Sequence, residues 1–193
     1  VCQNRSYNNL SILLSKRSNR ERSIQQCIKE SYFNCSNTMP VNIHREPINS
    51  IIDSFNSDIV LVDPAMADHG KLYYGFDDEF VGEMKTLCAK ADYIVPNITE
   101  ACYLTNTEYF ESYDQNKIEE LLVKLSKLGP KYVVLTGISF EDGKLGAAMY
   151  DSKTLEFKYY FNERVPLLFH GTGDIFASSF FGAGVVSTIL SRR

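Results

Sequence analysis

The sequence predicts an α/β fold: a mostly parallel sheet flanked by helices, with an antiparallel hairpin at one edge. From about residue 46 onward, short apolar runs alternate with longer segments whose apolar residues have a helical spacing. Strand, helix, strand, helix, strand is the order produced by right-handed crossovers between parallel strands. Near residue 150, two strand-like runs follow each other without a helix between them, which is typical of an edge hairpin in a mixed sheet.

Three short apolar runs predict buried parallel strands. They are "DIVLVDP" at residues 58–64, "DYIVPN" at 92–97 and "KYVVLTG" at 131–137. Each contains β-branched residues and ends at a proline, asparagine or glycine, as expected of a short strand covered on both faces. The edge hairpin is predicted from "KLGAAMYD" (144–151) and "LEFKYYF" (155–161), which flank "SKT".

Five segments predict helices. Apolar spacing indicates a helix in residues 46–55, and acidic residues at the start with lysine near the end favour another in 77–91. Residues 99–106 predict a short helix opened by a threonine cap, and residues 114–129 predict an amphipathic helix with a terminal glycine. The last helix follows Gly173.

Composition and charge exclude several classes of protein. The 193 residues suffice for one domain with a core, and 44% apolar with 23% charged residues is the balance of a soluble globular protein. No apolar run approaches the ~20 residues of a membrane span, and the first residues show no export signal. Five scattered cysteines without a C-x-x-C pair indicate neither a zinc site nor a disulfide framework, so we expect a reducing cytoplasm. A net charge of −4 gives no support to a nucleic-acid partner.

Residues 1–45 differ from the rest of the chain. This segment is rich in serine and asparagine and shows no sustained period of 2 or 3.6 residues. Residues 1–50 hold seven Lys and Arg against three Asp and Glu. The pattern is consistent with a solvated arm, with a basic arm that binds a partner, or with a segment that replaces something else. We therefore leave 1–45 unassigned and place a single domain at 46–193.

Polar residues follow each predicted parallel strand. In open sheets of this kind, ligands bind beyond the carboxyl ends of the strands. The candidate binding residues after the three strands are, in chain order, Asp63, Asp68, Asn97, Glu100, Thr136 and Gly137. Magnesium takes oxygen ligands and is usually held by one or two carboxylates with phosphates and water. Asp63, Asp68 and Glu100 therefore form a candidate magnesium shell, unless each is a plain turn or cap residue.

The stretch "HGTGDIFASSFFGAG" (170–184) has more polar and flexible residues at its head than a helix cap requires. Gly171 and Gly173 let the backbone approach a ligand, and free N–H groups at a helix start form an anion site. Asp174 suits such a place if it takes a proton from a hydroxyl that attacks a phosphoryl group held by the adjacent amides. The alternative is that Thr172 or Asp174 is only an N-cap, worth ~1 kcal/mol. The absence of a Walker pattern from the sequence excludes a P-loop enzyme.

Four of these motifs together resemble the vitamin B6 kinases, the pyridoxal/pyridoxamine kinases of the ribokinase-like superfamily. They are "VDPAMADHGKLYYGF" (62–76), "ADYIVPNITEACYLT" (91–105), "VVLTG" (133–137) and "HGTGDIFAS" (170–178). The resemblance covers about residues 46–190, in the family's order and spacing. It implies a ribokinase-like fold and the transfer of a phosphoryl group from ATP, with Mg²⁺, to the 5′-hydroxymethyl group of pyridoxal, pyridoxamine or pyridoxine.

The resemblance also implies roles for single residues, with Asp174 as the general base. It implies that the anion hole is formed by Gly171, Thr172 and Gly173, and that the metal is held by Asp63, Asp68 and Glu100. It implies that ATP is contacted by Asn97, Glu100, Thr136 and Gly137. It implies that the substrate is contacted by Tyr73 and His170. It further suggests a homodimer.

Two alternatives stay open. The hydroxymethylpyrimidine phosphate kinases, which act on thiamin precursors, show a similar pattern but usually have cysteine where Asp174 stands, so Asp174 and "ADHGKLY" favour the B6 branch. A non-catalytic, nucleotide-binding pseudoenzyme would instead use the basic arm to bind a partner.

The sequence departs from the B6 kinases at both ends. Residues 1–45 do not resemble the family's first strand and glycine-containing segment, and the family continues beyond the last helix where this sequence stops at Arg193. We therefore expect an open sheet edge, a retained nucleotide and metal half-site, and weak or absent B6 kinase activity.

Overall fold

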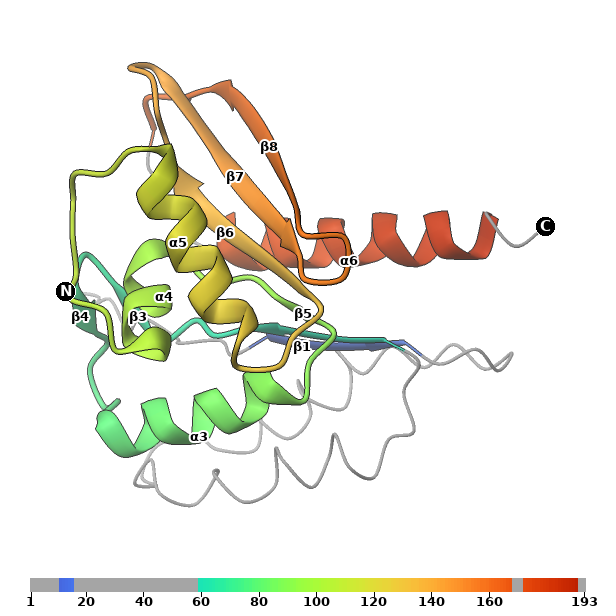
Figure 1. The fold of residues 1–193 in the computed structure, drawn as a ribbon, viewed down its shortest axis with the longest axis horizontal. Helices are drawn as coiled ribbons and strands as arrows, with labels where there is room; N and C mark the ends of the chain where they lie inside the picture. The colour runs from blue at the N-terminus through green and yellow to red at the C-terminus, as the bar shows by residue number, and fades with distance from the viewer. Residues whose placement is uncertain (1–10, 16–58, 168–171, 191–193) are drawn as a thin grey trace, which may run out of the picture.

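A six-stranded mixed sheet forms the centre of the computed structural model, which describes residues 11–15, 59–167 and 172–190 (Figure 1). In spatial order the strands are β1 (Ser11–Ser15), β2 (Ile59–Asp63), β5 (Tyr93–Ile94), β6 (Tyr132–Ile138), β7 (Lys144–Asp151) and β8 (Glu156–Glu163). The pairs β2–β5 and β5–β6 are parallel, and the other pairs are antiparallel. The predicted α/β class, its parallel strands and its edge hairpin are confirmed. The helix predicted at 46–55 lies outside the described residues.

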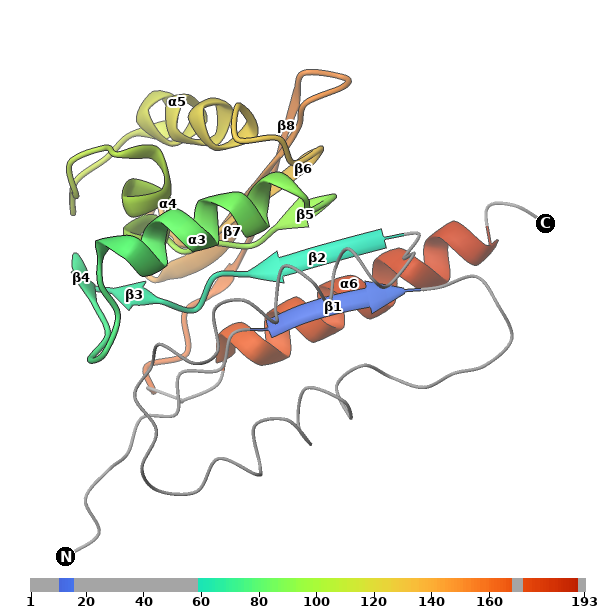
Figure 2. The same cartoon turned by 90° about the horizontal axis from the view of Figure 1, so that it is seen from below.

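Four helices in the described part of the chain cover the two faces of this sheet. They are α3 (Asp78–Ala89), α4 (Ile98–Thr105), α5 (Gln115–Ser126) and α6 (Thr172–Leu190). Figure 2 shows α3, α4 and α5 on one side of the strands and α6 on the other. The order of layers is therefore helix, sheet, helix, as the buried strands required.

The side chains of β2 point alternately to the two faces of the sheet, which explains why helices cover both faces. Val60 and Val62 point into a large core with apolar residues of α3, α4 and α5. Leu61, between them, packs in a second core with Val134 of β6 and Ala177 of α6. Successive side chains of a strand point to opposite faces, so a run that is apolar at every position needs a partner on both.

β1 corrects the expectation of an open sheet edge beside β2. It pairs antiparallel with β2 over its whole length, from Ser11 opposite Asp63 to Ser15 opposite Ile59. β2 is therefore an inner strand, flanked by β1 and β5. Residues 11–15 lack a period-2 pattern, so this strand is defined by its backbone pairing with β2 rather than by local alternation of side chains.

The N-cap of α4 is Asn97, which corrects the prediction of a threonine cap. Asn97 has an extended backbone with φ −82° and ψ 176°, and its side-chain oxygen accepts a hydrogen bond from the Glu100 N–H. The Glu100 side chain accepts from the Asn97 N–H in return, which completes a capping box. The Thr99 hydroxyl is therefore not needed to cap the helix.

A small separate hairpin follows β2. It consists of β3 (Ala67–Asp68) and β4 (Lys71–Leu72), which pair antiparallel. Its turn contains His69 and Gly70, both in the left-handed region with φ of 49° and 75°. We call this unit the β3–β4 hairpin. It places a polar turn next to α4, beyond the end of β2 (Figure 2).

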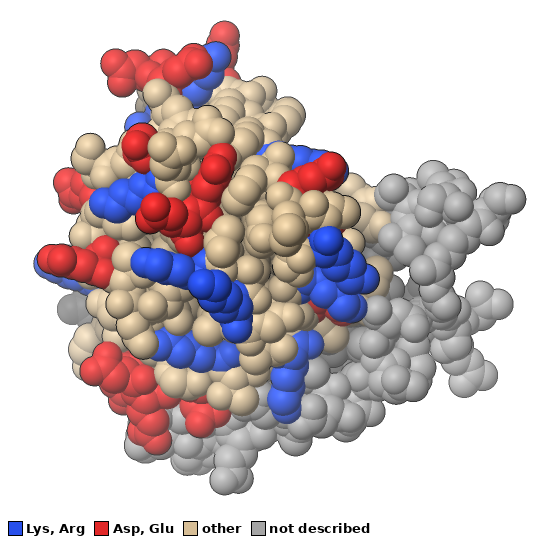
Figure 3. All heavy atoms as spheres, in the orientation of Figure 1, with Lys and Arg blue, Asp and Glu red and all other residues tan. Residues whose placement is uncertain are grey.

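Within the described ranges, no helix is long and apolar enough to cross a membrane. On the face shown in Figure 3, Lys and Arg side chains are interspersed with Asp and Glu instead of gathering into one basic patch.

Replacing Leu61 by alanine is expected to destabilise the fold by about 2–5 kcal/mol, because Leu61 is fully buried and links the sheet to α6. The matched control is Leu145→Ala on β7, where the side chain is 43% exposed and the cost should stay below about 1 kcal/mol. Urea unfolding followed by circular dichroism measures both. Equal losses in the two variants would contradict the packing described for β2.

Candidate active site

The carboxyl ends of β2, β5 and β6 lie at one edge of the sheet because the three strands are parallel. Asp63 is the last residue of β2. Asn97, just beyond β5, forms an isolated parallel bridge with Thr136 near the end of β6. Backbone pairing thus brings three of the predicted site residues to the same edge.

Asp63 lies beside the start of α6. Its side chain is only 7% exposed, and a Cβ placed on Gly173 would lie 3.8 Å from Asp63 Oδ2. Burial and, after it, the negative charge of Asp174 raise the pKa of Asp63 to about 7, against the opposite effect of a hydrogen bond from the Ala65 N–H. Two aspartates from different elements, β2 and α6, therefore lie close enough to interact.

The polar residues that precede the apolar part of the last helix form the first turn of α6. Thr172 and Gly173 are exposed, and Asp174 is half-buried. The first N–H groups of a helix have no partner within it and create a partly positive field that favours an anion. His170 and Gly171 lie outside the described residues. The described part of this turn offers amides for an anion next to a pair of carboxyl groups.

Glu100 is almost completely enclosed, and both of its oxygens accept hydrogen bonds from backbone donors. Its Oε1 accepts from the N–H groups of Met66 at 3.0 Å and Ala67 at 3.5 Å, and its Oε2 accepts from the Asn97 N–H at 2.9 Å. Burial raises the Glu100 pKa to about 8, the charge of Asp63 adds to this, and the three backbone donors oppose it. In the described structure this carboxylate holds backbone groups of α4 and of the segment after β2, and its part in a metal shell and in ATP binding stays a prediction.

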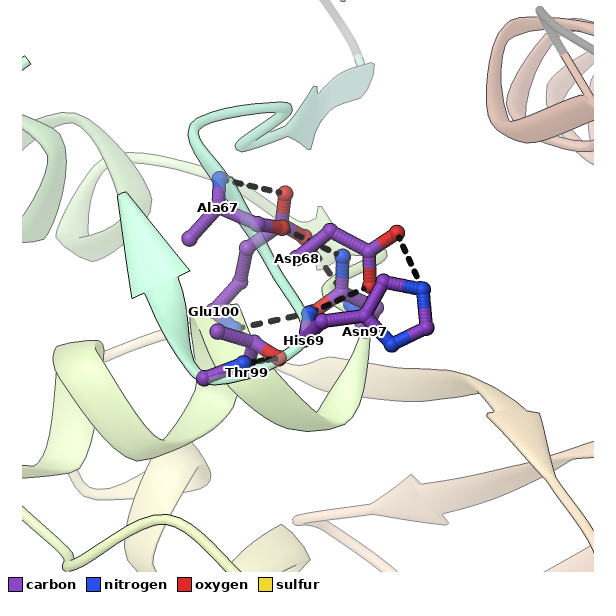
Figure 4. A network of polar contacts seen from close by, with 7 residues as sticks. Ala67, Asp68, His69, Asn97, Thr99 and Glu100 are labelled. Carbon is purple, nitrogen blue, oxygen red and sulfur yellow. Dashed lines mark hydrogen bonds and ion pairs between the residues drawn. The ribbon is translucent and has the colours of Figure 1, made fainter. Parts of the chain in front are cut away.

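The Asn97 side chain also makes two hydrogen bonds to the backbone. Its Oδ1 accepts from the Glu100 N–H at 2.9 Å, while its Nδ2 donates to the carbonyl oxygen of Ala67 at 2.8 Å. Figure 4 shows these bonds joining the start of α4 to the β3–β4 hairpin. Asn97 and Glu100 therefore fix the position of the hairpin relative to α4.

The β3–β4 hairpin carries two more predicted site residues toward the same region. Asp68 is half-exposed; its Oδ1 accepts from the His69 N–H at 2.8 Å and its Oδ2 lies 3.6 Å from His69 Nε2. Tyr73 follows β4 and is 36% exposed. Partial burial, followed by the charges of Asp68, Glu100 and Asp63, raises the pKa of Tyr73 to about 12. The Tyr73 hydroxyl therefore lies within the field of all three predicted acids.

These acids do not form a complete metal site made of protein groups alone. Among the residues that the structure describes, no group of three His, Cys, Asp or Glu side chains could hold a metal ion. The donor chemistry still fits Mg²⁺, because a buried Asp63 with a raised pKa beside Asp174 is a place where a divalent cation would relieve repulsion. Mg²⁺ also accepts phosphate and water oxygens, so one or two carboxylates suffice.

The end of β6 turns sharply at Gly137. Its φ is +72°, and the pairing of β6 with β7 shifts register between Thr136 and Ile138. No heavy atom lies within 4 Å of a Cβ placed on Gly137. The Thr136 hydroxyl donates to the Pro96 carbonyl at 3.3 Å. The backbone at this strand end is therefore open on one side and adopts a conformation that favours glycine.

Three residues outside the predicted set hold the turn of the β3–β4 hairpin. The Gly70 N–H donates to Thr99 Oγ1 at 3.0 Å, and the Tyr103 hydroxyl donates to the Gly70 carbonyl at 3.4 Å. A Cβ on Gly70 would lie 2.7 Å from Cδ1 of Tyr109, so the aromatic ring lies directly against this glycine. Gly70 is the sequence signal for this contact, because a glycine in a turn often marks a place where another part of the chain approaches the backbone closely.

Comparison with known proteins decides the family. Residues 43–185 match the family model described as phosphomethylpyrimidine kinase. The chain belongs to the phosphomethylpyrimidine kinase family. The solved structures that match this family member have the ribokinase-like fold of pyridoxal kinases, as the sequence motifs implied. No curated protein matches the chain.

Three of the solved structures illustrate the similarity. A Bacteroides thetaiotaomicron protein named a "putative phosphomethylpyrimidine kinase", in a crystal form with pyridoxal, is 26% identical with a TM-score of 0.67, over 84% of this chain and 61% of its own. Pyridoxal kinase from Lactobacillus plantarum is 27% identical with a TM-score of 0.63, over 77% and 60%. Plasmodium falciparum PdxK with AMP-PNP and PL is 25% identical with a TM-score of 0.51, over 61% and 40%. The family member described here thus spans about three fifths of the first two.

Asp63→Asn is expected to raise the thermal stability of the protein above pH 7. The pKa of Asp63 is raised from 3.8 to about 7 in the folded protein. Between about pH 4 and 7 the folded state therefore binds more protons than the unfolded state, and the wild type loses stability as the pH rises. Asparagine resembles the neutral acid and removes this loss. In melting temperatures measured from pH 4 to 8, the advantage of the variant should grow through this window and then level off.

The control for this measurement is Asp142→Asn, in the exposed loop between β6 and β7. Its melting temperature should follow the wild type at every pH. A difference between Asp63→Asn and the wild type that does not change with pH would contradict a buried, titrating Asp63.

Proposed function

We propose that the chain transfers the γ-phosphoryl group of ATP to the 5′-hydroxymethyl group of a B6 vitamer: pyridoxal, pyridoxamine or pyridoxine. One observation carries the proposal: Asp174, in the first turn of α6, lies beside the buried Asp63 at the carboxyl ends of the parallel strands. That arrangement puts a proton acceptor and an anion site in the same place.

In the proposed reaction, Asp174 accepts the proton of the 5′-hydroxyl group. The hydroxyl oxygen forms a bond to the γ-phosphorus of ATP, and the bond to the bridging oxygen of ADP breaks. The amides of Thr172 and Gly173, together with Gly171, hold the transferred group, whose negative charge the start of α6 favours. Asp63 and Asp68 would hold Mg²⁺, which when bound neutralises phosphate charge.

The other predicted residues divide into direct and indirect roles. Gly137 leaves open space at the end of β6, which supports contact of its backbone with the ATP phosphates. Asn97 and Glu100 act through the backbone, since their polar atoms bond to α4 and β3. Tyr73 and His170 are assigned to the substrate side.

Two considerations favour a B6 vitamer over a thiamin precursor. Asp174 occupies the position where the hydroxymethylpyrimidine phosphate kinases usually have cysteine. In addition, a solved relative at 26% identity contains pyridoxal. The family model, described as phosphomethylpyrimidine kinase, supports hydroxymethylpyrimidine as the second candidate substrate.

Asp174→Asn is expected to lower kcat with pyridoxal and Mg–ATP by roughly 10²–10⁴-fold, because it removes the proton acceptor but keeps the size of the side chain. Affinity for Mg–AMP-PNP should change little. The matched control is Asp78→Asn, which neutralises an acid in the first turn of α3 instead. A coupled assay for ADP measures turnover.

The same assay with hydroxymethylpyrimidine in place of pyridoxal distinguishes the candidates. Faster turnover of hydroxymethylpyrimidine would overturn the choice of substrate, and turnover that survives Asp174→Asn would overturn the mechanism. Binding of Mg–AMP-PNP without phosphorylation of either compound would identify a nucleotide-binding pseudoenzyme.

Removal of divalent metal is expected to stop phosphoryl transfer. Excess EDTA should reduce ADP formation to background, and added MgCl₂ should restore it, because the charged phosphates require a cation beside Asp63 and Asp68. EDTA saturated with Mg²⁺ beforehand is the control for effects of the chelator itself. Turnover that persists in EDTA would show that these carboxylates need no metal.

A further inference from the structure

The β3–β4 hairpin is too small to hold its own shape. Each strand has two residues, and the register contains only the pairs Ala67–Leu72 and Asp68–Lys71. An isolated two-stranded hairpin is marginally stable at best in water. The hairpin therefore depends on contacts from outside: Ala67 is buried in the large core and Leu72 packs against it, and polar contacts come from α4.

Contacts from outside converge on its two ends. At the β3 end, Glu100 and Asn97 bind the backbone of Met66 and Ala67. At the turn, the contacts that the described residues make from outside meet at Gly70, where Thr99 accepts its N–H at 3.0 Å and the ring of Tyr109 lies against it. Asn97 and Glu100 thus bind one end of the hairpin, and the other end is contacted by Thr99, Tyr103 and Tyr109.

Thr99 is well placed to act as a rigid anchor. It is 3% exposed and lies in the first turn of α4, whose start the capping box already fixes. Its hydroxyl accepts from the Gly70 N–H, and the Tyr109 ring packs against the same glycine, so helix, hairpin and the segment after α4 meet at this point. Figure 4 shows Thr99 beside Glu100, where α4 meets the hairpin.

The hairpin carries Asp68 on β3 and leads directly into Tyr73, whose N–H donates to the Met66 carbonyl at 3.0 Å. Both residues belong to the proposed site. We propose that Thr99 is a positioning residue: by holding the turn at Gly70 it sets where Asp68 and Tyr73 stand relative to the metal, the phosphates and the vitamer. This inference rests on the proposed function and adds a residue that itself touches neither substrate.

The test compares three variants of the full chain. Thr99→Val keeps the shape of the side chain and removes the hydroxyl, while Thr99→Ser keeps the hydroxyl. Thr105→Val is the matched control, because Thr105 lies on the same helix and bonds to Ala101 and Thr107, away from the hairpin.

In Thr99→Val, we expect amide hydrogen exchange in residues 66–73 to rise about fivefold, as one hydrogen bond to the turn is lost. Exchange in β6 should stay unchanged. We further expect kcat with pyridoxal to fall roughly tenfold, because small misplacements of reacting groups are costly. Thr99→Ser should restore both quantities, and Thr105→Val should alter neither.

Two results would overturn the inference. One is unchanged exchange in residues 66–73 of Thr99→Val, which would show that Thr99 does not hold the hairpin. The other is faster exchange with wild-type kcat and KM, which would make Thr99 merely structural.

If the wild type binds Mg–AMP-PNP but phosphorylates no substrate, the proposed function fails, and the affinity for Mg–AMP-PNP replaces kcat as the quantity that tests Thr99. A several-fold weaker affinity in Thr99→Val then supports the inference, and an unchanged affinity overturns it. If the wild type does not bind Mg–AMP-PNP either, the positioning role is overturned, and faster exchange in Thr99→Val shows only that Thr99 holds the hairpin.

Discussion

The buried carboxylate of Glu100 is the constraint on which the rest of the site depends. It accepts three backbone hydrogen bonds, two from the segment after β2 and one from the start of α4. Burying a carboxylate costs free energy unless its oxygens find donors, so these backbone groups must stay where they are. The requirement joins parts of the chain that are more than thirty residues apart. It brings the acid at the end of β2, the hairpin and α4 to one edge of the sheet.

Much of the fold could be predicted because it follows from local pattern. The runs at 58–64, 92–97 and 131–137 are short and apolar, and the structure has parallel strands at all three. Parallel strands have their carboxyl ends at one edge, so the same pattern predicted that Asp63 and Asn97 would lie at that edge. Predicting a site at Asp174 also required the knowledge that a polar turn at the start of an apolar helix often binds an anion.

What could not be predicted depends on partners far away in the sequence. β1 has no alternation of its own and exists through its pairing with β2. Glu100 looked like a free acid after a strand, since nothing in its neighbourhood reveals that Met66 and Ala67 supply its hydrogen bonds. The sequence predicted Thr99 as the N-cap of α4 because threonine and asparagine side chains can both cap the start of a helix.

The two faces of the sheet hold separate cores, and this has a consequence for how the molecule opens. Among the described residues, the core under α6 contains four buried side chains, Leu61, Val95, Val134 and Ala177, whereas the opposite face packs a far larger set. α6 packs through this core and not through the one on the opposite face, so a local opening of this core would release α6 without the other helices. Asp174 would leave with it, while the acids on β2, the hairpin and α4 stay in place.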